Sequence, residues 1–181
     1  MIERAAALLA LVLLGASCGA TSERPSPAPT PPTSEALTRP LRFDYLTLDG
    51  KPLSTETVAG RFTLIGFLAT YDVASQAEAR FLGGLLRRHT PRINVAALAL
   101  ESEEKLPIVE AFAHTMGLEY PVAIADGVTI AGQGPFAGLH HVPSVVLLDR
   151  QGREVWRHVG LAEEGTIEKA LRAAEARDPA R

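Results

Sequence analysis

The pattern of apolar and polar residues after position 40 predicts alternating strands and helices. Phe62–Leu68 and Ile93–Leu100 are short, continuous apolar runs, as expected of strands that are buried on both faces of a sheet. Ser75–His89 and residues 103–116 instead repeat apolar side chains at helical spacing. This order predicts a parallel pair of strands joined by a crossover helix.

Each of the two predicted helices has one apolar face. In the first helix, this face holds Ala77, Phe81 and Leu85, with Leu82 beside it. In the second helix, the corresponding residues are Leu106, Val109, Phe112 and Ala113. We expect these faces to pack on the sheet.

The C-terminal part of the chain predicts an antiparallel hairpin and a closing helix. Ser144–Asp149 is an apolar strand, turn residues follow it, and Glu154–Val159 is the answering strand. A helix is predicted over residues 163–176, and Leu41–Leu48 predicts a further hairpin or an initial strand. Together, the elements predict one α/β domain over residues 41–177. Its expected architecture is a three-layer sandwich with a mixed central sheet and helices on both faces.

The N-terminal residues 1–18 have the pattern of a bacterial lipoprotein signal peptide. An apolar run over residues 5–14 leads into the small residues Gly15, Ala16 and Ser17 and then Cys18. The run is about half of the roughly 20 residues that span a bilayer, so a transmembrane helix is not expected. We predict that Cys18 carries fatty acyl chains such as palmitate, which anchor the protein to a membrane. The alternative is an ordinary signal peptide, cut near Ala16 or Ala20, which leaves Cys18 removed or free.

Residues 19–40 predict an extended tether between this anchor and the domain. They are rich in Pro, Ser and Thr and hold almost nothing apolar to bury. Gly19 follows Cys18 where an Asp would favour the inner membrane. We therefore place the protein in the cell envelope, on the periplasmic side of the outer membrane if the cell is Gram-negative.

Charge and cysteine content exclude some classes of function. The net charge is −3 and no basic run is present, so a nucleic-acid partner is not expected. One cysteine cannot form an internal disulfide. No motif indicates a cofactor, and we predict none.

Two local strings resemble the thioredoxin-like domains of membrane-tethered thiol–disulfide oxidoreductases. Residues 67–75, Phe-Leu-Ala-Thr-Tyr-Asp-Val-Ala-Ser, are similar to the string F-W-A-T-W-C-x-x-C of the TlpA type, in the redoxin (AhpC/TSA) superfamily. Residues 141–155, which include Val142-Pro143 and an Asp-x-x-Gly turn, are similar to that group's G-V-P-T-x-F-L-I-D-x-x-G-x-I. The resemblance implies a thioredoxin-like fold and, by family, an oxidoreductase or antioxidant redoxin.

The resemblance places Asp72 and Ser75 at the two cysteine positions, so the dithiol is missing. A peroxiredoxin pattern fails as well, because the residue three places after Thr70 is Val73 and not a cysteine. No catalytic residue is therefore assigned. Asp72 suits a helix N-terminus, where its carboxylate accepts from backbone N–H groups, and Ser75 could instead form a capping box with Glu78. Whether Asp72 and Ser75 are only caps or have a functional role stays open at this point.

By the same resemblance, Pro143 matches a cis-proline beside a groove that holds an extended peptide. Here the groove would be bounded by Tyr71, Val142, Pro143 and Ser144, next to Asp72. The alternative is that the loop is kept for packing alone. We predict a peptide- or protein-binding or scaffolding module without redox activity. The competing prediction is an oxidoreductase that works by a non-dithiol route or with a partner's cysteines.

Two adjacent histidines lie close to Pro143 in the sequence. His140 and His141 precede Pro143, and with Asp72 they would offer two imidazoles and a carboxylate to a metal ion. Neighbouring residues of an extended loop tend to point in opposite directions, so we do not predict a metal site from them.

Overall fold

The computed structural model describes residues 39–178, whose centre is a five-stranded mixed sheet in the order β5-β4-β3-β6-β7. Strands β3, β4 and β5 run parallel, and β6 and β7 are antiparallel to their neighbours. The strands are β3 (Phe62–Leu68), β4 (Ile93–Ala99), β5 (Val122–Ile124), β6 (Ser144–Leu148) and β7 (Glu154–Val159). The predicted mixed sheet is confirmed.

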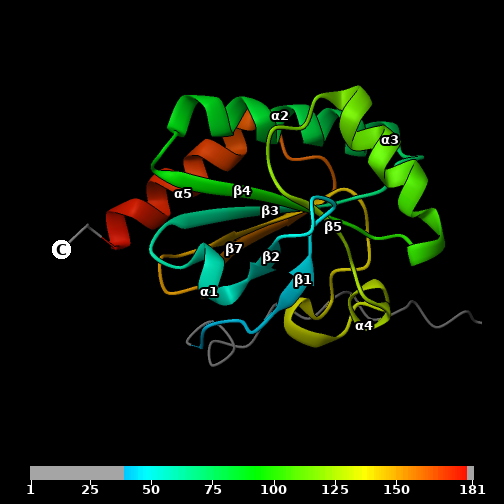
Figure 1. Ribbon diagram of the computed structural model, residues 1–181. Helices are drawn as coiled ribbons and strands as arrows, with labels where there is room; N and C mark the ends of the chain where they lie inside the picture. Colours follow the sequence, from blue (N-terminus) through cyan, green and yellow to red (C-terminus); the bar gives the residue numbers. More distant parts are fainter. Residues whose placement is uncertain (1–38, 179–181) are drawn as a thin grey trace, which may run out of the picture. The chain divides into compact units, whose positions relative to one another are not determined.

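Helices cover both faces of this sheet (Figure 1). Helices α2 (Val73–His89), α3 (Leu106–Met116) and α5 (Glu164–Arg177) pack on one face around a core that includes Leu64, Leu82 and Leu171. The other face carries shorter elements, around a second core that includes Ile65, Phe67 and Phe136. These are the antiparallel hairpin β1 (Asp44–Leu46) and β2 (Pro52–Ser54), helices α1 (Thr55–Val58) and α4 (Gly127–Ile130), and the 3₁₀ turn η3 (Gly134–Phe136). A second 3₁₀ turn, η2 (Glu103–Lys105), directly precedes α3.

The predicted apolar face of the first helix is confirmed at Leu82 and Leu85 and is wrong at Ala77 and Phe81, which are only partly buried. In α2, the fully buried residues include Ser75, Glu78, Ala79 and Leu82, whereas Phe81 is only partly buried. A close approach to β3 explains this orientation. Gly66 lies under Leu82, and a Cβ atom at Gly66 would stand 2.5 Å from Leu82 Cδ1.

Several short elements were not expected from the sequence. Strand β5 and helix α4 have three and four residues, too few to show a period. In the second predicted helix, residues 103–105 form η2, and Leu106 is exposed although it was expected on the apolar face.

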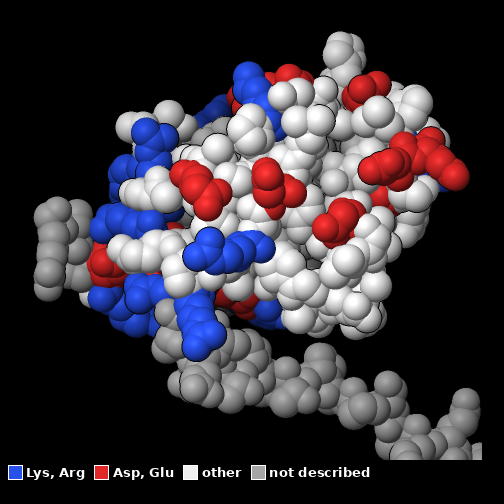
Figure 2. All heavy atoms as spheres, turned by 60° about the horizontal axis from the view of Figure 1, so that its bottom comes forward, with Lys and Arg blue, Asp and Glu red and all other residues white. Residues whose placement is uncertain are grey.

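The two ends of the sheet differ in their charged side chains, and the first described residues contact only one of them. Asp72 follows the C-terminal end of β3, and we call this end the Asp72 end. At the opposite end, the Leu41 N–H donates to the Gly152 carbonyl at 2.9 Å, so the described chain joins the domain there. This arginine end is lined by Arg61, Arg92, Arg150, Arg153 and Arg177. Figure 2 shows Lys and Arg gathered on one side of that view, with Asp and Glu spread over the other side.

Some predictions fall on residues that the structure does not describe. The signal peptide, Cys18 and nearly all of the tether lie outside residues 39–178. Among the described residues, no helix combines the length and apolar character needed to cross a bilayer.

Candidate functional site

Asp72 and Ser75 are joined by hydrogen bonds at the start of α2. Asp72 is the N-cap, and its Oδ2 accepts hydrogen bonds from both the backbone N–H and the Oγ–H of Ser75, each at 2.7 Å. Ser75 is fully buried, and its Oγ accepts in turn from the Ala69 N–H at 3.1 Å. The predicted cap at Asp72 is confirmed. The capping box of Ser75 with Glu78 is wrong, because the helix begins at Val73 and Ser75 already lies in its first turn.

Glu78 lies one turn further along α2 and is a buried acid. Its Oε2 accepts from the Ala162 N–H at 2.7 Å, while its Oε1 is buried with no hydrogen-bond partner among the described residues. Burial raises the pKa of Glu78 from 4.5 to about 7, although the hydrogen bond from Ala162 opposes this shift. From the sequence, Glu78 was predicted only as the partner of Ser75 in a capping box. The available signal was its helical spacing with Ser75 and Leu82, which places it on the buried face.

The loop before β6 brings Pro143 to the Asp72 end of the sheet. Ser144 is paired in register with Phe67, the penultimate residue of β3. The Val142–Pro143 peptide bond is cis. Ser144 is buried and its hydroxyl donates to the His141 carbonyl at 2.7 Å, while the Pro143 carbonyl accepts from the Gly160 N–H at 2.9 Å. The Ser144 side chain is therefore engaged within the loop.

Exposed apolar side chains surround the start of α2. Tyr71 and Val73, on either side of Asp72, are each 77% exposed. Val159 and Leu161 are also exposed, and they flank Gly160, whose N–H binds the Pro143 carbonyl. No hydrogen bond within the described residues engages the backbone of Val142. This end of the domain thus combines apolar contact area with unpaired backbone groups.

The two histidines lie against each other, with ring centroids 4.1 Å apart, and both are exposed. Within residues 39–178, no three His, Cys, Asp or Glu side chains are grouped so that they could hold a metal ion. The structure therefore does not assemble His140, His141 and Asp72 into a ligand set.

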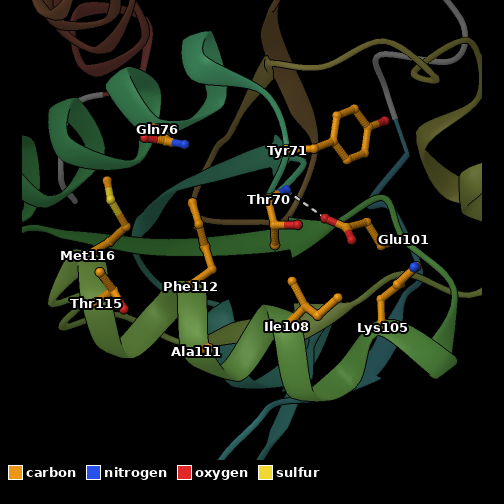
Figure 3. Close-up of a pocket in the computed structure, with 10 residues that line it drawn as sticks. All are labelled: Thr70, Tyr71, Gln76, Glu101, Lys105, Ile108, Ala111, Phe112, Thr115 and Met116. Carbon is orange, nitrogen blue, oxygen red and sulfur yellow. Dashed lines mark hydrogen bonds between the residues drawn. The ribbon is translucent and has the colours of Figure 1, made fainter.

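A pocket of about 530 Å³ opens beside the site, between the start of α2 and helix α3 (Figure 3). It is lined by Thr70, Tyr71, Gln76, Glu101, Lys105, Ile108, Ala111, Phe112, Thr115 and Met116. Glu101 follows β4, and its Oε1 accepts from the Thr70 N–H at 2.5 Å. Sequence reasoning missed this pocket. Glu101 directly follows a predicted strand, at the edge where parallel strands end together, and this position was the only indication.

The comparisons with known proteins agree with the fold. No family model matches the chain. In sequence, it is 26% identical over 130 residues to "Thiol-disulfide oxidoreductase ResA" of Bacillus thuringiensis and equally to that of Bacillus anthracis, covering 72% of this chain and 73% of each relative.

Solved structures give the same picture. A thioredoxin-family thiol:disulfide interchange protein from Chlorobium tepidum superposes with a TM-score of 0.65 at 22% identity, covering 76% of this chain and 95% of that one. A secreted disulfide oxidoreductase of Mycobacterium tuberculosis, homologous to DsbE of E. coli, gives 0.60 at 18% identity, covering 78% and 99%. The domain thus has a thioredoxin-like α/β fold and is similar to redoxins of the TlpA, ResA and DsbE type.

Proposed function

We propose that this protein is a lipid-anchored, thioredoxin-like module of the cell envelope that binds an extended peptide or protein segment without exchanging disulfides. The observation that carries the proposal is the pairing of Asp72 with Ser75. A carboxylate and a hydroxyl stand at the positions implied for the dithiol, and neither group can be oxidised to a disulfide. Residues 39–178 hold no cysteine.

The surface around this pair supports binding. Large exposed apolar side chains in one place mark interaction sites, and Tyr71 and Val73 are among the most exposed of the described apolar residues. The Val142 backbone has no partner within the domain, so an extended chain can pair with it as an added strand. In this proposal, main-chain pairing at Val142 fixes the direction of the segment and Tyr71 supplies apolar contact.

The anchor and the location rest on the sequence. Cys18, preceded by Gly15, Ala16 and Ser17, is the proposed site of lipidation, and residues 19–40 are the tether. One of the similar solved structures is described as secreted, in keeping with a place outside the cytoplasm.

A binding measurement tests this function directly. The full chain is titrated with a fluorescently labelled, permanently unfolded protein, such as carboxymethylated insulin B chain, and anisotropy is recorded. We expect saturable binding that is weakened in Tyr71→Ala and in Val142→Pro, which removes the Val142 N–H. Leu46→Ala is the matched control, because Leu46 is 70% exposed but lies in the hairpin and lines a different pocket from Tyr71. Equal binding by all variants would contradict the proposal.

The second candidate function is an oxidoreductase that borrows cysteines from a partner. The similarity to ResA favours it. Reduction of insulin by dithiothreitol separates the two candidates, because a binding module gives no acceleration above buffer. Acceleration by the full chain would favour the oxidoreductase.

A further inference from the structure

We infer that the pocket beside Tyr71 receives a Lys or Arg side chain of the bound segment, with Glu101 as the group that recognises its charge. The inference rests on the proposed function, since it names the residue type that the binding site selects. It concerns the pocket between α2 and α3 and not the Asp72–Ser75 pair.

The pocket has an apolar wall suited to an aliphatic stem. Ile108, Phe112 and Met116 follow one another at four-residue spacing on α3, so they form a single stripe along the helix. Figure 3 shows these side chains projecting from α3 into the space below Thr70 and Gln76. Ile108 is half exposed, which leaves apolar surface uncovered at the mouth. Long basic side chains lay their methylene groups on surfaces of this kind.

Glu101 places a carboxylate at one end of this apolar pocket. It is only 8% exposed, and one oxygen, Oε1, is held by the Thr70 N–H. The other oxygen, Oε2, has no hydrogen-bond partner among the described residues. This oxygen is not among the buried atoms that lack a partner, so it is open to the pocket. An ammonium or guanidinium group can therefore donate a charge-assisted hydrogen bond to it.

The pocket lining carries one other charge. Lys105 is the single cation among the lining residues, and it forms no salt bridge with another described residue. Lys105 therefore competes with an incoming basic side chain for the open oxygen of Glu101. Glu103, Glu104 and Glu110 are exposed and do not line the pocket, so the recognition of charge rests on Glu101.

The position of the pocket links it to the peptide surface. Tyr71 belongs both to the exposed apolar area beside Asp72 and to the pocket lining. The volume of about 530 Å³ lies within the range of small-ligand pockets and is ample for one long side chain. A segment that lies across Tyr71 can therefore place one side chain along Ile108 and Phe112 toward Glu101.

Three labelled peptides test the inference by anisotropy with the full chain. They share the sequence acetyl-Gly-Ser-Val-X-Val-Ser-Gly-amide, where X is arginine, norleucine or glutamate. We expect the arginine peptide to bind about tenfold more tightly than the norleucine peptide, because a charge-assisted hydrogen bond forms in a buried site. The glutamate peptide should bind more weakly than both.

Two variants assign the preference to Glu101. Glu101→Gln keeps an oxygen for the Thr70 N–H but removes the charge, and it should abolish the preference for arginine over norleucine. Glu104→Gln removes an exposed acid of the same region and should leave that preference within about twofold, since exposed charges contribute little. If Glu101→Gln proves unstable, Lys105→Met serves in its place, because loss of the competing cation should tighten binding of the arginine peptide.

The outcomes separate this inference from the proposed function. Equal binding of the arginine and norleucine peptides would overturn the role of Glu101 and leave peptide binding intact. An equal loss of preference in Glu104→Gln and Glu101→Gln would show a general effect of charge and would also overturn it. If no peptide binds, the inference and the proposed function fail together.

Discussion

A single carboxylate oxygen of Asp72 accepts both the backbone N–H and the hydroxyl of Ser75 at the start of α2. The two residues are thus joined by hydrogen bonds at the positions where the resemblance to redoxins implies a dithiol. These bonds stabilise the helix start and leave no group there that can carry electrons.

Asp72→Ala should destabilise the domain by about 2 kcal/mol. The helix loses its N-cap, and the buried Ser75 hydroxyl loses its acceptor. Urea denaturation followed by circular dichroism measures the change. Asp72→Asn is the control, because its side-chain oxygen can still accept, and it should recover part of the loss. An unchanged midpoint in Asp72→Ala would contradict the structural role given to this carboxylate.

Replacing both residues by cysteine should create a redox-active dithiol. A thiolate at position 72 would lie at the N-terminus of α2, where backbone N–H groups and the helix dipole stabilise negative charge. We expect the double variant Asp72→Cys with Ser75→Cys to accelerate insulin reduction by dithiothreitol. The single variant Asp72→Cys lacks a resolving thiol and should not. A double variant that forms the disulfide by mass and still leaves insulin unreduced would show that more than the two cysteines is missing.

Glu78 should make the domain less stable as the pH rises from about 4.5 to about 7. The folded state keeps a proton on Glu78 up to a pKa of about 7, whereas the unfolded state releases it near 4.5. The unfolded state therefore binds fewer protons in this window, and the free energy of unfolding falls by about 3 kcal/mol. Stability from this group is fully present below pH 4.5 and is lost above pH 7.

Glu78→Gln tests this pH dependence. We expect the variant to match the wild type near pH 4.5 and to be more stable at pH 8, as measured by urea denaturation across the range. Glu104→Gln, an exposed acid, should leave the slope of the wild type unchanged. Parallel curves for wild type and Glu78→Gln would rule out an uncharged Glu78 in the folded protein.

Gly66→Ala should destabilise the contact between β3 and α2. The new methyl group would lie 2.5 Å from Leu82 Cδ1, so Leu82 or the helix must move, at a cost of about 1–3 kcal/mol. In the double variant with Leu82→Val, which shortens the opposing side chain, the combined loss should be smaller than the sum of the two single losses. Strict additivity of the two substitutions, measured by urea denaturation, would mean that this contact does not decide the packing.

Cys18→Ser should release the protein from the membrane fraction. Lipid chains attached at Cys18 are the proposed anchor, and the described residues contain no helix that could replace it. Fractionation of cells that express the wild type and the variant, with mass spectrometry of the N-terminal peptide, measures the change. Retention of the Cys18→Ser protein in the membrane would point to a different anchor.

The sheet could be predicted from the sequence because its central strands are short, continuous apolar runs. Leu64 and Ile65 are adjacent and face opposite cores, so the run around them has to be apolar throughout. Helix α2 shows the limit of the same reasoning. Its buried face holds Ser75 and Glu78, two polar residues with hydrogen-bond partners inside the fold, while the apolar Phe81 lies partly exposed. Apolarity alone therefore identified Leu82 and Leu85 but missed the polar residues of the buried face.

The candidate site was only partly visible in the sequence. Asp72 and Ser75 stood in one recognisable string, and the cap at Asp72 followed from residue chemistry. The pocket at Glu101 could not be found in this way, because its walls come from two stretches of the chain, residues 70–76 and 101–116, that only the packing of α3 brings together. Thr70 and Glu101, which share a hydrogen bond, are 31 residues apart.

The first described residues and the candidate site lie at opposite ends of β3. Leu41 binds Gly152 at the arginine end, and the seven residues of β3 extend from there toward Asp72, a length of about 20 Å. A molecule bound at Tyr71 and Asp72 therefore leaves the contact between Leu41 and Gly152 unchanged, so the two ends of the domain can be altered independently.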